Sequence, residues 1–161
     1  MVIVLDSTPL GLILQKPGFG PADECRSWIQ RQLNGGSRVC VPAIISYEIR
    51  RELHRLQNSR SLALLDAFIQ AAPNRYVELT DAQLQRAAEL WGDLRRAGRP
   101  TADSQALDID VILSAQALSL NLPPSEYVIA TSNVAHLGLL APARPWQQIC
   151  LEVRRARRVH L

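Results

Sequence analysis

The sequence predicts an α/β fold, a single three-layer α/β/α sandwich with a mainly parallel sheet. Short apolar runs typical of buried strands alternate along the chain with longer segments in which apolar residues recur at helical spacing. The 161 residues fit one domain, and neither an internal repeat nor a linker divides them. We therefore expect one domain over residues 1–150 and a basic C-terminal tail over residues 151–161.

The strands are expected where short apolar runs meet turn residues, and the helices where the period lengthens. Asn34-Gly35-Gly36 is a typical helix end, Pro42 can open a helix, and Thr80 or Asp81 can cap one. The stretch "QKPGFGPAD" is expected to be a loop because it is dense in Gly and Pro. We expect strands over Val2–Leu5, Arg38–Val41, about 75–80, Tyr127–Ala130 and near Gln148–Leu151. We expect helices over about 22–33, 42–57, 61–71, 82–97 and 106–120.

The composition points to a globular protein that works outside membranes. Hydrophobic residues make up 47% of the chain, and no apolar run approaches the roughly 18 residues that a membrane span needs. Asp6 interrupts the first apolar run and no basic leader precedes it, so a secretory signal is not expected. The cysteines Cys25, Cys40 and Cys150 form no CxxC pair and suggest small buried side chains in a reducing compartment. A cytoplasmic protein is the expectation.

The basic residues are almost all arginine, since Lys16 is the only lysine. The net charge is +3 and the isoelectric point about 9.1. A biased genome explains such a preference, and so does phosphate binding, because the planar guanidinium can hold two oxygens at once. The tail "EVRRARRVHL" carries four arginines and one glutamate. A basic tail is usually a solvated end, and contact with RNA is the alternative.

Asp6 follows directly after the first strand, which places its carboxylate at the carboxyl end of that strand. Ligands of open parallel sheets bind at this edge. Glu48 and Glu52 lie in the helix after the second strand. Glu48 is one turn nearer the strand end and is the favoured partner for Asp6. Glu52 falls inside the predicted apolar stripe, with a surface pair to arginines at helical spacing as an equal alternative.

A third acid is expected from "SQALDIDVILSAQAL", the start of an apolar and therefore buried helix. Asp108 and Asp110 point about 200° apart on a helix, so only one can join a shared cluster. Asp108 is suited to capping the helix, which leaves Asp110 in the first turn, where the helix dipole favours a carboxylate. Asp103 is the exposed alternative, expected only to cap.

The fourth strand runs into Thr131, Ser132 and Asn133, whose oxygens emerge on the same edge as Asp6. A turn with an Asn helix cap is the structural alternative. Three carboxylates with hydroxyl and amide oxygens form a hard-oxygen site suited to Mg²⁺ or Mn²⁺. Such close like charges raise each other's pKa unless a cation is present, and a bound divalent ion can activate water for phosphoryl chemistry.

In this order the four segments resemble the motifs of the PIN domain family, especially the VapC-like bacterial ribonucleases. The segments are "VLDSTPLGL" at Asp6, "VPAIISYEIRREL" at Glu48, "DVILSAQAL" at Asp110 and "VIATSNVAHLGLL" at Thr131, Asn133, His136 and Leu137. The match extends over nearly the whole chain. Each motif alone is weak, but four of them in the right order and spacing are fairly specific.

The resemblance implies a PIN-like fold and a metal-dependent endoribonuclease. It implies that Asp6, Glu48 and Asp110 hold Mg²⁺ or Mn²⁺, that Asn133 completes the catalytic set, and that Ser7 or Thr131 supports the phosphate or a water. It also implies RNA as substrate, a small antitoxin that neutralises a toxin, and a homodimer. Many family members have a fourth acid where this chain has Asn133, so the number of metal ions stays open between one and two.

Two other enzyme classes fit poorly. A haloacid-dehalogenase-like phosphatase needs a second Asp two residues after the first, where this chain has Thr8. A dinucleotide-binding domain needs GxGxxG, which is absent from the sequence. The remaining alternative is a PIN-like module that binds RNA or a protein without cutting, and the neutral Asn133 is its best support. His136 is expected to pack or to face RNA. Trp28, Trp91 and Trp146 are expected in the core.

Overall fold

The computed structural model describes residues 1–101, 103 and 108–150. Within this part, strands and helices alternate as the sequence predicts, and most of the helices come in pairs between the strands. In chain order they are β1 (Val2–Leu5), α1 (Ser7–Ile13), α2 (Gly20–Asn34), β2 (Arg38–Pro42), α3 (Ala43–Arg55), α4 (Ser59–Gln70), β3 (Tyr76–Val77), α5 (Asp81–Arg96), α6 (Ile109–Leu118), β4 (Tyr127–Thr131), α7 (Val134–Leu137), β5 (Ala143–Pro145) and a 3-10 turn (Trp146–Gln148).

The five strands form one sheet in the order β3-β2-β1-β4-β5, and every neighbouring pair is parallel. The chain builds outward from β1 in both directions, because β2 lies on one side of it and β4 on the other. The gap between the carboxyl ends of β1 and β4 is therefore the point where the strand order reverses, which is where open α/β sheets bind their ligands.

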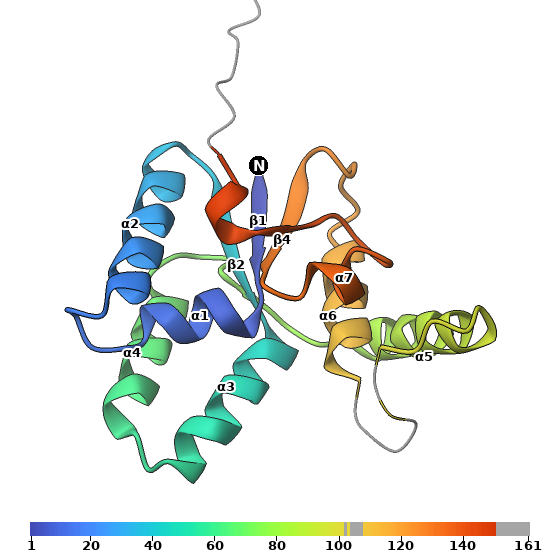
Figure 1. The fold of residues 1–161 in the computed structure, drawn as a ribbon, viewed down its shortest axis with the longest axis horizontal. Coiled ribbons are helices and arrows are strands. Elements are labelled where there is room, and N and C mark those ends of the chain that lie inside the picture. The colour runs from blue at the N-terminus through green and yellow to red at the C-terminus, as the bar shows by residue number, and fades with distance from the viewer. Residues whose placement is uncertain (102, 104–107, 151–161) are drawn as a thin grey trace, which may run out of the picture.

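Helices cover both faces of the sheet, so the predicted three-layer α/β/α fold is confirmed. Right-handed crossovers send α1 to α4 to one face, because the chain moves from β1 to β2 to β3, and α5 to α7 to the other, because it then moves to β4 and β5. Figure 1 shows α1, α2 and α4 on one side of the strands and α5, α6 and α7 on the other. The core lies between these layers. The β1 residues Ile3, Val4 and Leu5 are all buried in it.

The predicted last strand near Gln148–Leu151 is wrong within the described residues. The strand β5 lies earlier, at Ala143–Pro145, and the chain turns into a 3-10 helix from Trp146. The short helix α1, which begins directly after Asp6, was not expected. The short helix α7, which follows Asn133, was considered only in the structural alternative of an Asn helix cap. The expected start of the fifth helix near residue 106 and the basic tail lie outside the described residues.

The cysteine and tryptophan predictions hold in part. Cys25 and Cys40 are buried free thiols, and Cys150 is free but exposed. Burial raises the pKa of the Cys25 thiol to about 12, so it behaves as a small apolar side chain. Trp28 and Trp146 are buried with ring centroids 5.6 Å apart. Trp91 is half-buried beneath the Arg95 guanidinium. No helix in the described ranges is long and apolar enough to cross a membrane.

Candidate functional site

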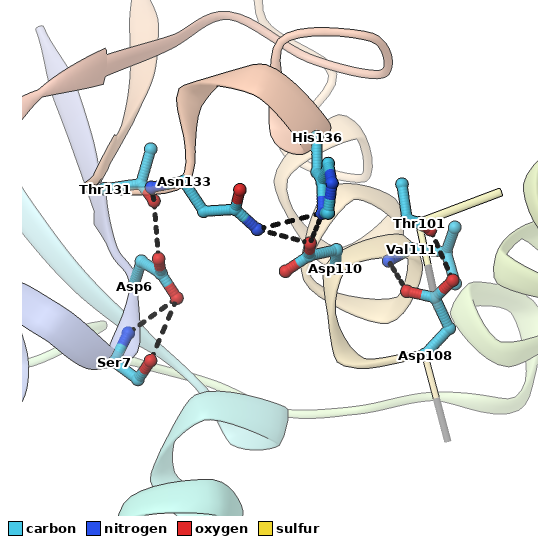
Figure 2. Close-up of polar contacts among 9 residues, drawn as sticks. All are labelled: Asp6, Ser7, Thr101, Asp108, Asp110, Val111, Thr131, Asn133 and His136. Atoms are coloured by element: carbon cyan, nitrogen blue, oxygen red, sulfur yellow. Dashed lines mark hydrogen bonds and ion pairs between the residues drawn. The ribbon is translucent and has the colours of Figure 1, made fainter. Parts of the chain in front are cut away.

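Two parallel strands bring Asp6 and Thr131 together at the carboxyl edge of the sheet. Leu5 of β1 is paired with Ala130 of β4, so the next residue of each chain segment emerges at the same level. The backbone N–H of Asp6 donates to the Ala130 carbonyl at 3.1 Å. The Thr131 hydroxyl donates to Asp6 Oδ2 at 2.6 Å, as Figure 2 shows. The strand register alone therefore fixes the position of the first acid.

Asp6 is only 6% exposed, and its carboxylate is held by polar groups on two sides. Oδ1 accepts from the backbone N–H of Ser7 at 2.6 Å and faces the Ser7 hydroxyl at 3.4 Å. This contact also makes Asp6 the N-cap of α1, where a carboxylate satisfies a helix N–H that has no partner inside the helix. Hydrogen bonds from both directions fix the orientation of the carboxylate (Figure 2).

At the start of α6, Asp108 and Asp110 point in different directions, as expected for residues two apart on a helix. Asp108 is the N-cap and accepts from the Val111 N–H at 3.4 Å and from the Thr101 hydroxyl. Asp110 lies in the first turn and points the other way, toward Asn133 and His136 (Figure 2). The prediction that Asp108 caps and Asp110 joins the edge is confirmed. Asp103 lies exposed.

Asn133 links the two halves of the site. Its backbone N–H donates to the Thr131 hydroxyl oxygen at 2.7 Å, and its side-chain Nδ2 donates to Asp110 Oδ2 at 2.8 Å. The side chain of Asn133 does not cap α7, which was the structural alternative. A continuous chain of hydrogen bonds thus runs from Asp6 through Thr131 and Asn133 to Asp110, as the dashed lines in Figure 2 trace for the side chains.

Glu48 approaches this edge from α3, which begins immediately after β2. Burial raises the pKa of the Glu48 carboxyl, and the negative charge of Asp6 raises it further, while the Ser7 hydroxyl and Arg51 act in the opposite direction. Glu48 therefore lies within electrostatic range of Asp6. Glu52, one turn later, is exposed and forms an ion pair with Arg55, which lowers the pKa of Glu52. Of the two alternatives for Glu52, the structure shows the surface pair with an arginine, while the neighbouring Leu53 packs against the core.

The acids at the edge repel one another. Burial raises the pKa of Asp110 to about 6, with further contributions from the charges of Asp6 and Asp108, and His136 opposes the rise. Among the described residues, however, no three or more His, Cys, Asp or Glu side chains are gathered tightly enough to form a metal-ligand group as they stand. Thr131 and Asn133 occupy part of the space between Asp6 and Asp110.

Sequence reasoning placed His136 in a motif but gave it no contact with an acid. In the structure His136 Nδ1 lies 3.4 Å from Asp110 Oδ2 and 3.3 Å from Asn133 Nδ2. The only signal for this is the three-residue spacing from Asn133, which α7 turns into proximity. A further hydrogen bond joins the segments that follow β1 and β4 at the exposed rim of the site, where the hydroxyls of Thr8 and Ser132 lie 2.8 Å apart.

No protein-family model and no curated protein sequence matches this chain. Solved structures do resemble it. A chain of VapBC-1 from nontypeable Haemophilus influenzae gives a TM-score of 0.66 at 16% identity, covering 92% of this chain and 100% of that chain. A chain of FitAcB from Neisseria gonorrhoeae gives 0.64 at 14% identity, with 91% and 99% covered. A chain of DNA-bound VapBC from Salmonella typhimurium gives 0.63 at 19% identity, with 91% and 98% covered. The expected resemblance to a VapC-like PIN domain is thus confirmed at the level of the fold.

Proposed function

We propose that this protein is a metal-dependent endoribonuclease that hydrolyses RNA phosphodiester bonds. The observation that carries the proposal is that three acids from separate segments lie within electrostatic range at the strand-reversal edge, since Asp6 after β1 acts on both Glu48 in α3 and Asp110 in α6. The charge of Asp6 raises the pKa of both Glu48 and Asp110, and acids perturbed in this way by burial and a nearby charge are typical of functional sites.

The donor set fits Mg²⁺ or Mn²⁺. Carboxylate, hydroxyl and amide oxygens are the ligands these hard cations prefer, and Mg²⁺ usually keeps several waters and binds through only one or two carboxylates. This habit is compatible with acids that converge without forming a tight cage. When bound, the ion would supply positive charge against the phosphate oxygens and make a coordinated water more acidic.

The remaining side chains have roles that follow from their contacts. Thr131 and Ser7 orient the Asp6 carboxylate, and the exposed rim hydroxyls offer donors to a phosphate. Asn133 holds Asp110 through a neutral amide where many PIN domains carry an acid. We therefore propose Asp6, Glu48 and Asp110 as the metal-binding acids, and Asn133 as the residue that positions Asp110.

The resemblance to VapC supports a wider setting for the same proposal. A toxin of this kind would be neutralised by a small antitoxin protein and would form a homodimer. The three free cysteines suit a reducing compartment, so we place the protein in the cytoplasm. A short antitoxin-like gene next to this one would support the toxin assignment.

The test compares two acids one turn apart in the same helix. Glu48→Gln should abolish Mg²⁺-dependent cleavage of a labelled total RNA, while Glu52→Gln should leave it intact, because Glu52 only pairs with Arg55 at the surface. Asp6→Asn should match Glu48→Gln, and EDTA should match both. Thermal melting confirms that each variant is folded. Equal cleavage by all variants, with and without EDTA, would refute the metal-site assignment.

One observation favours a second function, a PIN-like module that binds RNA or a protein without cutting it. The amide of Asn133 adds no negative charge to the site, so metal affinity is weaker than with a fourth acid. The same assay separates the two functions. RNA that stays intact in Mg²⁺ and in Mn²⁺, while gel-shift assays show binding, would favour the non-cleaving module.

A further inference from the structure

The helix that carries Glu48 also presents an exposed aromatic side chain beside the site. Tyr47 is 52% exposed, although the chain holds only 5% aromatic residues and most of its large apolar side chains are buried. On α3 the buried face is formed by Ile44 and Ile45, and Tyr47 lies on the outer face. Glu48 is the next residue, about 100° around the helix from Tyr47 and closer to the core.

An arginine on the same face lies over this ring. The Arg51 guanidinium carbon is 5.9 Å from the centroid of the Tyr47 ring, at the four-residue spacing that stacks side chains along a helix. Arg51 also acts electrostatically on Glu48, whose pKa it lowers. The pair is therefore adjacent to the acid site and not merely on the same helix.

The arginines of α3 differ in their partners. Arg50 forms an ion pair with Asp66, and Arg55 forms one with Glu52. Arg51 has no ion-pair partner among residues 1–101, 103 and 108–150, and the Tyr47 hydroxyl makes no hydrogen bond with that part of the chain. An arginine without an ion-pair partner in the described part of the chain, and an exposed aromatic ring with that arginine over one face, thus lie together beside Glu48.

We propose that Tyr47 and Arg51 bind an unpaired RNA strand next to the cleavage site, with a base stacked on the Tyr47 ring and a phosphate held by Arg51. An aromatic face accepts any base but needs it unstacked from its own helix, and guanidinium suits phosphate. This inference rests on the proposed ribonuclease function and adds to it two substrate-binding residues outside the acid site, Tyr47 and Arg51.

Binding is measured in an Asp110→Asn background, so that the RNA stays intact, by fluorescence anisotropy with a labelled unstructured 12-nucleotide RNA. The two comparison ligands are a ribose-phosphate strand of the same length without bases and a blunt duplex. Tyr47→Leu should raise the Kd for the base-containing strand about tenfold and leave the Kd for the abasic strand unchanged. Tyr47→Phe should retain tight binding. Tyr76→Leu is the matched control, because Tyr76 is an exposed tyrosine on β3, two strands from β1.

The phosphate contact has its own readout. Arg51→Gln should lower the slope of log Kd against log salt by about 0.7, the value for one phosphate contact on a single strand, whereas Arg55→Gln should not change it. If the wild type cleaves RNA but Tyr47→Leu binds normally, or if the duplex binds as tightly as the single strand, the inference is overturned and the ribonuclease function stands. If the wild type neither cleaves nor binds RNA, both are overturned.

Discussion

At the scale of single residues, the two aspartates of the edge have different surroundings. Asp6 accepts hydrogen bonds from the Ser7 N–H and from Thr131, both part of the same sheet edge. Asp110 accepts one hydrogen bond, from the side-chain amide of Asn133, and lies near His136. Its pKa, raised to about 6, means that the folded protein holds this carboxylate in water-poor surroundings at neutral pH at a cost in stability.

Removing the Asp110 charge should therefore stabilise the metal-free protein. The folded pKa is about 6 and the ordinary value is 3.8, so the folded state binds more protons in this range and stability falls as the pH rises from about 4 to 6. In EDTA, Asp110→Asn should exceed the wild type in free energy of unfolding by up to about 3 kcal/mol at pH 8. The difference should vanish below pH 4. Urea unfolding at several pH values measures it, with the exposed Asp93→Asn as control, and equal stability at pH 8 would contradict the prediction.

Asn133 offers the opposite test, because a carboxylate there would face Asp110 at hydrogen-bond distance. Asn133→Asp removes the donor to Asp110 Oδ2 and places a like charge beside it. We expect a loss of about 1.5–3 kcal/mol in EDTA, the usual contribution of a hydrogen bond to a charged group. Mg²⁺ should then raise the melting temperature more than it does for the wild type, because tighter binding to the folded state stabilises it further.

The control for this change is Asn121→Asp, at an exposed loop position. It should alter neither the melting temperature in EDTA nor the response to Mg²⁺. A Mg²⁺ response of Asn133→Asp no larger than that of the wild type would mean that residue 133 lies outside any cation site.

The sequence was sufficient to place Asp6, Glu48 and Asp110 on their elements, because the strand or helix pattern defines each position, and their role in a metal site stays a prediction. It was not sufficient to assign the side chain of Asn133 or the contact of His136. Both depend on how far α7 turns back over α6, and a four-residue helix has no periodicity of its own. The helical wheel could not decide between the apolar stripe and a surface pair for Glu52, because the choice depends on where the Arg55 side chain lies, and the structure shows the pair.

At the scale of helices and strands, one buried side chain holds α3 in place. Gln116 of α6 is 1% exposed, and its Oε1 accepts from the backbone N–H of Ile44 at 3.2 Å. Its Nε2 donates to the carbonyls of Val77 and Glu78 at 2.9 and 3.1 Å. The N-cap of α3 is Pro42, which provides no side-chain acceptor, so Gln116 satisfies a helix N–H that would otherwise have no partner. It thereby ties the helix of Glu48 to the helix of Asp110.

Gln116→Leu should destabilise the protein by about 2–4 kcal/mol, because a side chain of similar size removes the partner of one buried N–H and of two partly buried carbonyls. Cleavage should fall as well, since the position of α3 is no longer fixed by α6. Thr80→Ala is the matched comparison, because it removes the capping box of α5 at a distance from the edge. It should cost about 1 kcal/mol and leave the cleavage rate unchanged. Chemical denaturation and initial cleavage rates measure both, and a Gln116→Leu protein with wild-type stability would contradict this account.

The helices and strands that the sequence predicted each have a clear pattern of apolar residues, and those that it missed do not. The apolar runs of β1, β2 and β4 and the periodic segments of α2 to α6 carry their own signals. The helix α1 contains Pro9 and Gly11, both poor helix formers, and it forms because Asp6 caps it and Leu10 is buried. The strand β5 is three residues long and ends in Pro145, so its pairing with β4 and not its sequence makes it a strand.

At the scale of the whole molecule, the acids of the candidate site and the excess of positive charge belong to different parts of the chain. The order β3-β2-β1-β4-β5 brings the acids to one edge of the sheet, and the proposed function requires a polyanion to bind at this negatively charged edge. Of the 18 basic and 15 acidic residues, four arginines and Glu152 lie in the tail 151–161, which leaves 14 of each sign before residue 151. The net charge of +3 therefore comes from the tail alone, a division that the sequence shows without any structure.

This division makes the tail the expected source of non-specific RNA affinity. Replacing Arg154, Arg155, Arg157 and Arg158 by Gln keeps the chain length and should lower the slope of log Kd against log salt by up to about 3, at about 0.7 for each phosphate contact. The cleavage rate at saturating RNA should stay at the wild-type value, because the proposed catalytic residues all precede residue 151. Anisotropy titrations from about 50 to about 300 mM salt measure the slope, because counterion release dominates binding in this range. An unchanged slope would mean that the tail is a solvated end and that the arginines of the domain, Arg51 first among them, supply the contacts with RNA.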